Sequence, residues 1–207
     1  MKKFIAIILF GILIFCISGC VFEDVCFFYS DSAEYNGFSV EVNKVARCCF
    51  VGKYHCTEYA DRCEITIPDE YKGMPIISIG GSVGRGVPSP FFIDCSDVYM
   101  NAPEDSKYDA VFSSDISMYE NDGNYTIEPV VFVLNIGKNI KEVEFVLMDD
   151  YYPHINEDGS ITFYHPVVEI NCSEENKYFY SRQGKLYDRK TDALIDGFAY
   201  KELLQAQ

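Results

Sequence analysis

The chain has 207 residues, of which 17 are basic and 32 are acidic, so its formal net charge is −15. This length suits one domain that buries a substantial core, and the excess of negative charge argues against nucleic acid and anionic headgroups as partners, because like charges repel. Sixteen Tyr, sixteen Phe and no Trp are typical of chains rich in strands, where aromatic side chains pack across neighbours.

The amino-terminal segment combines a basic start with an apolar run. Two lysines precede residues 4–17, which carry no charge. At about 1.5 Å per helical residue these fourteen residues span about 21 Å, which is short for a hydrocarbon core about 30 Å thick. A basic start, a run of this length and small residues after it are the parts of a secretory signal.

The apolar run ends in Ile17, Ser18, Gly19 and Cys20, which resembles a bacterial lipobox. The resemblance implies that residues 1–19 are removed as a signal peptide and that Cys20 is acylated. A diacylglyceryl group carries two acyl chains, and stable anchoring takes two signals. We therefore expect an extracytoplasmic protein attached to the cell membrane by lipid. An uncleaved anchor helix, or an ordinary signal cut at another bond, is the alternative, and either would also export the domain.

Seven of the nine cysteines lie beyond Cys16 and the anchor. In an exported protein the default expectation is disulfides, and an odd number leaves at least one thiol free or paired with another molecule. A zinc site is disfavoured because the spacings lack a C-x2-C pair, and reduced, buried thiols are a further alternative. The candidate disulfide cysteines are Cys26, Cys48, Cys49, Cys56, Cys63, Cys95 and Cys172.

Residues 20–36 are predicted to be an acylated tether, although residues 25–29 are apolar enough to dock back on the domain. Residues 37–207 are predicted to form a single domain of short strands. Phe38, Val40 and Val42 alternate with polar residues, which indicates a half-buried strand. The continuous apolar run 130–136 predicts a central strand. Further strands are expected at residues 64–67, 76–79, 142–147, 161–163 and 167–170.

The remaining segments predict loops, a hairpin and little helix. Residues 80–126 are rich in Gly, Pro, Ser and Asp, and because loops of that length are uncommon, we expect a short element near residues 89–93. Residues 156–159 predict a turn. Residues 185–187 and 193–195 flank a polar stretch and predict a hairpin, and residues 199–206 predict one or two helical turns.

Three segments together resemble BspA-like leucine-rich repeat proteins. Residues 65–80, I-T-I-P-D-E-Y-K-G-M-P-I-I-S-I-G, are similar to the T-I-P-x-x-Y-x-G-x-P-V-x-x-I-G unit of that family. Residues 135–143 look like its I-G-x-x-V-x-x-I variant, and residues 169–195 resemble its hairpin-bearing repeat. In such repeats one short strand lies beside the next and no repeat buries its apolar face alone. The resemblance implies surface display and binding or adhesion, and it carries no catalytic residues.

The segments also depart from the family pattern. The usual A-F-x-x-C turn after I-G is missing, and only residues 92–95 echo it. With so few degenerate repeats we expect a mainly β fold: a short, irregular, solenoid-like β stack with long loops and little helix.

Other chemical motifs have ordinary structural readings. The glycine-rich residues 80–86 lack the G-K-[ST] ending of a phosphate loop, and no known nucleophile motif occurs. An acidic cluster could serve acid–base catalysis or bind calcium, but His154 occupies the position where an EF-hand needs its first acidic ligand. His55, His154 and His165 are far apart in sequence. The acidic cluster comprises Asp149, Asp150, Glu157 and Asp158.

The sequence therefore predicts a lipid-anchored surface lipoprotein that is not an enzyme and uses no cofactor or metal. Its expected partners are the membrane, through the lipid on Cys20, and a protein or glycan ligand. The alternatives are an accessory subunit of an envelope enzyme, motivated by the acidic cluster, and a self-protection or inhibitor lipoprotein.

Overall fold

The computed structural model describes residues 30–60, 62–81, 90–101, 125–144, 146, 148 and 151–201. In this part of the chain the fold is mainly β, with one short helix, α2 (Ser96–Tyr99). The prediction of a mainly β fold with little helix is confirmed. Cys20, Cys26, the signal segment 1–19 and most of residues 199–206 lie outside the described residues. Among the described residues, no helix is long and apolar enough to cross a membrane.

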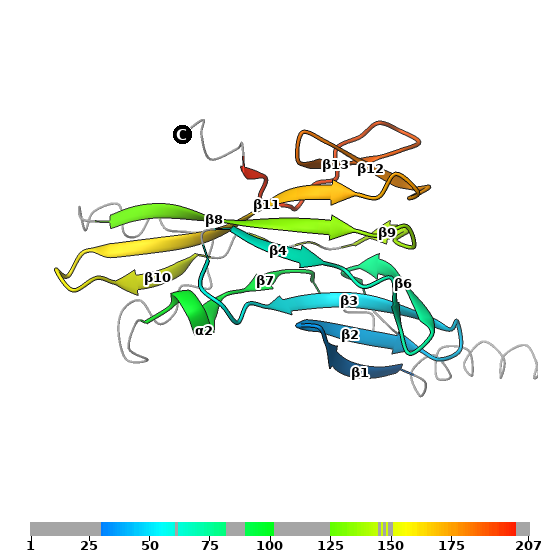
Figure 1. The fold of residues 1–207 in the computed structure, drawn as a ribbon, viewed down its shortest axis with the longest axis horizontal. Coiled ribbons are helices and arrows are strands. Elements are labelled where there is room, and N and C mark those ends of the chain that lie inside the picture. The colour runs from blue at the N-terminus through cyan, green and yellow to red at the C-terminus, as the bar shows by residue number, and fades with distance from the viewer. Residues whose placement is uncertain are drawn as a thin grey trace, which may run out of the picture.

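The described strands form two larger sheets and one hairpin (Figure 1). In the seven-stranded sheet the order is β1 (Ser30–Tyr35), β2 (Phe38–Asn43), β3 (Cys48–His55), β6 (Met74–Ile79) and β5 (Glu70–Tyr71), with β7 (Ile93–Asp94) beside β3 and β9 (Glu142–Val143) beside β6. The four-stranded sheet has the order β10 (Tyr152–Ile155), β11 (Ile161–Cys172), β8 (Tyr125–Ile136) and β4 (Arg62–Thr66). The hairpin pairs β12 (Phe179–Arg182) with β13 (Lys185–Asp188). Figure 1 shows the four-stranded sheet between the β1–β3 layer and this hairpin.

Three strand pairs close on two-residue turns that end in glycine. The turns are Asn36–Gly37 between β1 and β2, Lys72–Gly73 between β5 and β6, and Gln183–Gly184 between β12 and β13. Both residues of each turn have positive φ, for example 53° and 72° in the last. Such type I′ turns match the twist of paired strands, and glycine adopts positive φ without a steric cost.

Strand β8 is the centre of the four-stranded sheet, as its apolar run predicts. It pairs in parallel with β11 on one side and β4 on the other. Ile65, Leu134 and Ile170 lie in register across the three strands and are each at most 2% exposed. A strand that is apolar on both faces is buried only when both faces are covered, so β8 requires the elements around it.

The alternating strand at the start of the domain is also confirmed. Phe38, Val40 and Val42 are buried in β2, and the residues between them are half-buried. Strand β1 pairs with β2 along its whole length, although its residues fall in the range predicted to be tether. The folded sheet therefore begins no later than Ser30, in agreement with docking of the tether on the domain.

Some predicted elements differ in extent. A short element does follow residue 89, where Phe91 bridges to Val146 and β7 begins two residues later. Of the described residues in the predicted strand 142–147, Glu142–Val143 form β9 and Val146 makes an isolated bridge. The predicted hairpin of residues 185–187 and 193–195 is present only as an isolated bridge between Tyr187 and Leu194. The main carboxy-terminal hairpin instead pairs β13 with the preceding strand, β12, because the type I′ turn lies at residues 183 and 184.

An ion-paired carboxylate joins β11, β4 and the carboxy-terminal segment. Glu169 Oε2 lies 2.6 Å from Arg62 Nη2, and Oε1 lies 2.8 Å from Lys201 Nζ. The hydrogen bond from Arg62, followed by that from Lys201, lowers the pKa of Glu169 to about 2. The folded chain therefore stabilises the ionised carboxylate of Glu169 more than the unfolded chain does.

We expect Glu169→Gln to lower the free energy of unfolding by about 1 kcal/mol at pH 7, measured by urea denaturation. The pKa is about 2 in the folded chain and near 4.3 when unfolded, so this contribution is present above the unfolded value. It is lost as pH falls toward the folded value, and the two proteins should converge there. Glu175→Gln is the control, because Glu175 pairs with Lys138 at 3.4 Å on an exposed surface. An equal loss in both variants, or a pH-independent loss, would contradict the assignment.

Candidate functional site

The hairpin region differs in charge from the rest of the chain. Residues 177–190 contain five basic residues and one acidic residue, whereas the whole chain carries −15. The basic residues are Lys177, Arg182, Lys185, Arg189 and Lys190. Charge segregation of this kind creates a local positive potential on a molecule that otherwise repels anions.

The side chain of Asn176 holds the start of the hairpin in place. Asn176 is 1% exposed, and its Nδ2 donates to the carbonyls of Gly137 and Ile140 at 2.8 and 3.0 Å. Its Oδ1 accepts from the backbone N–H groups of Tyr178 and Phe179 at 2.8 and 2.9 Å. An amide side chain has two donors and two lone pairs, so all four are used to join the β8–β9 turn to β12.

The alternation of β12 and β13 directs two tyrosines outward. Phe179 and Leu186 point to the core and are at most 5% exposed. Successive side chains of a strand point to opposite faces, so Tyr180 and Tyr187 occupy the outer face. They are cross-strand partners, and their rings stack with centroids 5.4 Å apart and planes at 20°.

Two guanidinium groups lie over these rings. The guanidinium carbon of Arg182 is 4.4 Å from the centroid of Tyr187, and that of Arg189 is 5.6 Å from the centroid of Tyr180. Asp192 accepts a hydrogen bond from the hydroxyl of Tyr180 and lies 4.0 Å from Arg182 Nη1. Cation–π contacts of this kind stabilise the side chains in place, so the face is ordered before any ligand arrives.

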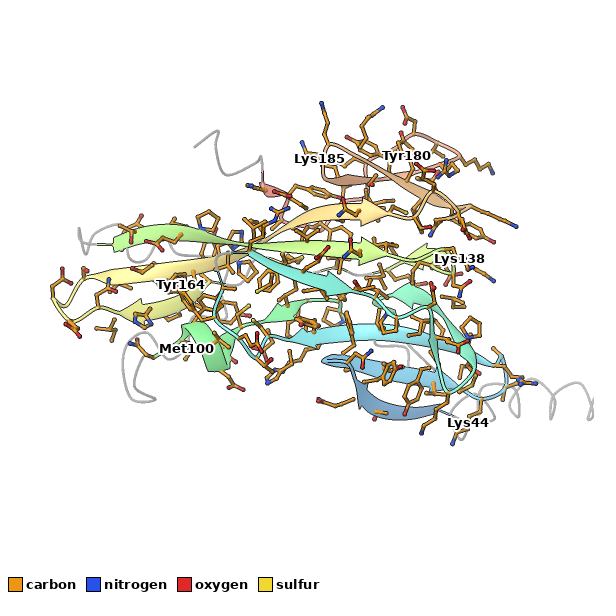
Figure 2. The ribbon with its side chains drawn as sticks, in the orientation of Figure 1. Lys44, Met100, Lys138, Tyr164, Tyr180 and Lys185 are labelled. Atoms are coloured by element: carbon orange, nitrogen blue, oxygen red, sulfur yellow. The ribbon has the colours of Figure 1, made fainter. Side chains whose placement is uncertain are left out.

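A polar hollow of about 420 Å³ lies beside the start of the hairpin. Lys138 pairs with Glu175 at 3.4 Å, whereas Lys141 and Lys177 form no salt bridge within the part of the chain that the structure describes. The hollow is lined by Lys138, Asn139, Lys141, Glu175, Lys177 and Tyr178. It therefore extends the basic surface beyond the stacked rings, as Figure 2 indicates for Lys138 below Tyr180 and Lys185.

We call the outer surface of the hairpin the basic aromatic face. Flat, rigid rings present large contact area at small entropic cost, and guanidinium groups bind carboxylate, sulfate or phosphate oxygens through paired donors. This arrangement can hold a ring-shaped ligand that carries negative charge. The face comprises Tyr178, Tyr180, Arg182, Lys185, Tyr187 and Arg189.

The structure brings three of the predicted disulfide cysteines together and separates the others. Cys56 and Cys95 directly follow the paired strands β3 and β7, and Cys63 in β4 is near enough to lower the pKa of Cys56. Cys48 and Cys49 are buried side by side in β3. Cys172 lies apart in β11, where burial raises the pKa of its thiol to about 11. All six described cysteines are thiols.

The acidic cluster does not converge as far as the structure describes it. Glu157 and Asp158 are exposed in the predicted turn, which the Gly159 N–H closes by donating to the Asn156 carbonyl at 3.0 Å. Asp158 Oδ1 accepts from Ser160 at 2.6 Å, and this hydrogen bond lowers the pKa of Asp158. Asp149 and Asp150 lie outside the described residues.

The three histidines have separate environments. His55 lies 3.0 Å from Asp97, and His165 stacks on Tyr151 with centroids 4.4 Å apart. His154 contacts Asn101 at 3.2 Å. Within the described ranges, no group of three potential ligands is placed to hold a metal ion.

The chain matches no protein-family model, no curated protein and no solved structure. The repeat resemblance therefore stays a prediction, and the assignment of function depends on the side chains themselves. Sequence analysis did not single out the hairpin face, although the run of basic residues at 177–190 in an acidic chain was a visible signal.

Asn176→Asp should lower the free energy of unfolding by about 3 kcal/mol, because it removes two donors and places a carboxylate against two carbonyls in a buried position. Urea denaturation at pH 7 measures the change. The matched control is Asn171→Asp, since Asn171 is exposed and makes one side-chain hydrogen bond, to Asn135 at 3.2 Å. Equal midpoints for Asn176→Asp and the unmutated chain would show that this amide does not hold the hairpin.

Proposed function

We propose that this protein is a lipid-anchored surface module that binds an acidic glycan through the basic aromatic face. The observation that carries the proposal is the half-buried, stacked pair Tyr180 and Tyr187 under two guanidinium groups, on a chain of net charge −15. Tyr178 beside them is 44% exposed. Aromatic rings pack against the apolar faces of sugar rings, and arginines pair with carboxylate or sulfate groups.

The chain's own charge favours a glycan over a larger polyanion. After loss of Lys2 and Lys3 the mature chain has 15 basic against 32 acidic residues, a net charge of −17. A long, stiff polyanion that contacts surface beyond the hairpin meets repulsion there. A glycan segment of a few sugars lies on the hairpin alone, so it gains the stacking and the ion pairs without that cost.

The strand arrangement supports the repeat-like reading as part of this proposal. The three segments that resemble BspA-like repeats begin in the last residues of β4, β8 and β11, which pair in parallel and in register. On the second side, β6 and β9 also pair in parallel. In this reading the hairpin caps a short, irregular stack and carries the ligand.

Charge removal from the face tests the proposal. Arg182→Gln with Lys185→Gln should weaken binding to a sulfated or carboxylated polysaccharide about tenfold, or about 1.4 kcal/mol, measured by biolayer interferometry with full-length protein in detergent. Raising the salt from about 0.1 to about 0.5 M should weaken the unmutated protein in the same way, because screening shortens the reach of these charges.

Lys44→Gln with Arg47→Gln is the matched control, since it removes one lysine and one arginine from the β2–β3 turn, and its binding should equal that of the unmutated chain. Neutral dextran should not bind. Retention of polysaccharide binding after Arg182→Gln with Lys185→Gln would refute the site. Single-stranded DNA that binds as tightly as the polysaccharide would show that the face recognises charge alone and would refute the glycan assignment.

The anchor is tested separately. Intact mass spectrometry of the native protein should give a chain that starts at Cys20 and carries a diacylglyceryl group, and the protein should partition into detergent. Cys20→Ser should lose the lipid and keep residues 1–19, because only a thiol forms the thioether. An unmodified Met1 in the unmutated protein would contradict the lipoprotein assignment.

A further inference from the structure

Cys56 and Cys95 meet at the end of a parallel strand pair, far from the hairpin in sequence. His55 of β3 is the register partner of Asp94 of β7, and the Cys56 N–H donates to the Asp94 carbonyl at 2.8 Å. The two cysteines are therefore the next residues of adjacent chains, about 4.8 Å apart by strand spacing. A disulfide needs a Cα separation of about 4.4 to 6.8 Å, so this pair fits without rearrangement of the backbone.

A third thiol comes from the other large sheet. Hydrogen bonding with Cys95 is the main reason that the pKa of Cys56 is lowered to about 7, and Cys63 lowers it further. The Cys63 thiol itself donates to the carbonyl of Ala60 at 4.0 Å. Ala60, which lies between Cys56 and Cys63 in the chain, is held by Tyr99, whose hydroxyl accepts from the Ala60 N–H at 3.2 Å and donates to the Ala60 carbonyl at 2.9 Å. The three cysteines thus come from the segments after β3 and β7 and from β4.

The three thiols differ in exposure. Cys95 is 0% exposed and Cys56 is 3% exposed, whereas Cys63 is half-buried. A disulfide reagent from solution therefore reaches Cys63 first. Cys95 and Cys63 both lower the pKa of Cys56, so Cys56 has the more stable thiolate and is close enough to exchange with both.

We propose that Cys56, Cys63 and Cys95 form a thiol–disulfide exchange site, in which Cys63 accepts a low-molecular-weight disulfide and Cys56–Cys95 is the final disulfide. This site is independent of the hairpin and of the glycan proposal.

The exchange proceeds in three displacements. The Cys63 thiolate attacks one sulfur of oxidised glutathione, forms a mixed disulfide and releases one glutathione thiolate. The Cys56 thiolate attacks the Cys63 sulfur and expels the second glutathione. The Cys95 sulfur attacks the Cys56 sulfur and expels the Cys63 thiolate, which takes up the proton that Cys95 loses. One external disulfide is reduced to two thiols, and Cys56 and Cys95 together lose two electrons.

Reduced full-length protein in detergent is treated with oxidised glutathione, quenched in acid, alkylated and mapped by peptide mass spectrometry. We expect glutathione on Cys63 at early times and the Cys56–Cys95 disulfide at the end. Cys95→Ser should stop at Cys56–Cys63. Cys63→Ser should still form Cys56–Cys95, at a rate about tenfold lower, because the first reacting thiol is missing.

Cys172→Ser is the control and should change neither rate nor product. The disulfide map of the unmutated chain tests the Cys56–Cys95 pairing even where a variant fails to fold. The proposal is overturned if Cys56 and Cys95 stay reduced in excess oxidised glutathione, if Cys56 pairs with a cysteine outside the trio, or if Cys63→Ser oxidises at the unmutated rate while its far-UV circular dichroism is unchanged.

Discussion

The exposed hairpin depends on one buried amide. Asn176 uses both of its donors on the β8–β9 turn and both lone pairs on the backbone of β12. A buried amide is tolerated only when its hydrogen bonds are made, so the loop and the hairpin are positioned together. This junction places Phe179 in the core. Because side chains alternate along a strand, the next residue, Tyr180, points to the outer face.

Charge and ring stacking then act on the same small area. In the proposed function, the acidic remainder of the molecule repels anions and the basic hairpin attracts them. The rings of Tyr180 and Tyr187 are already stacked and covered by guanidinium groups, so little conformational freedom is lost when a ligand binds. The proposed binding site needs no cleft, since its contact area comes from flat side chains on a strand pair.

The proposed exchange site, Cys56, Cys63 and Cys95, depends on the two large sheets and not on the hairpin. Cys56 and Cys95 directly follow β3 and β7 of the seven-stranded sheet, and Cys63 belongs to β4 of the four-stranded sheet, so the three cysteines come from the two different sheets. The hydroxyl of Tyr99 makes two hydrogen bonds to the backbone of Ala60 beside these cysteines. A Cys56–Cys95 disulfide would link the ends of β3 and β7, which are already paired. It would therefore change the reactivity of the thiols more than the fold.

The sequence by itself determined the strand-rich class, the alternation in β2, the central position of β8 and the turn at Gly159, because each depends on local periodicity or turn chemistry. It also contained the motif from which the anchor at Cys20 is predicted. Only the tertiary structure decided which cysteines meet and which tyrosines face outward. Those outcomes depend on strand order and register between residues far apart in the chain, and a one-residue change of register reverses every side chain.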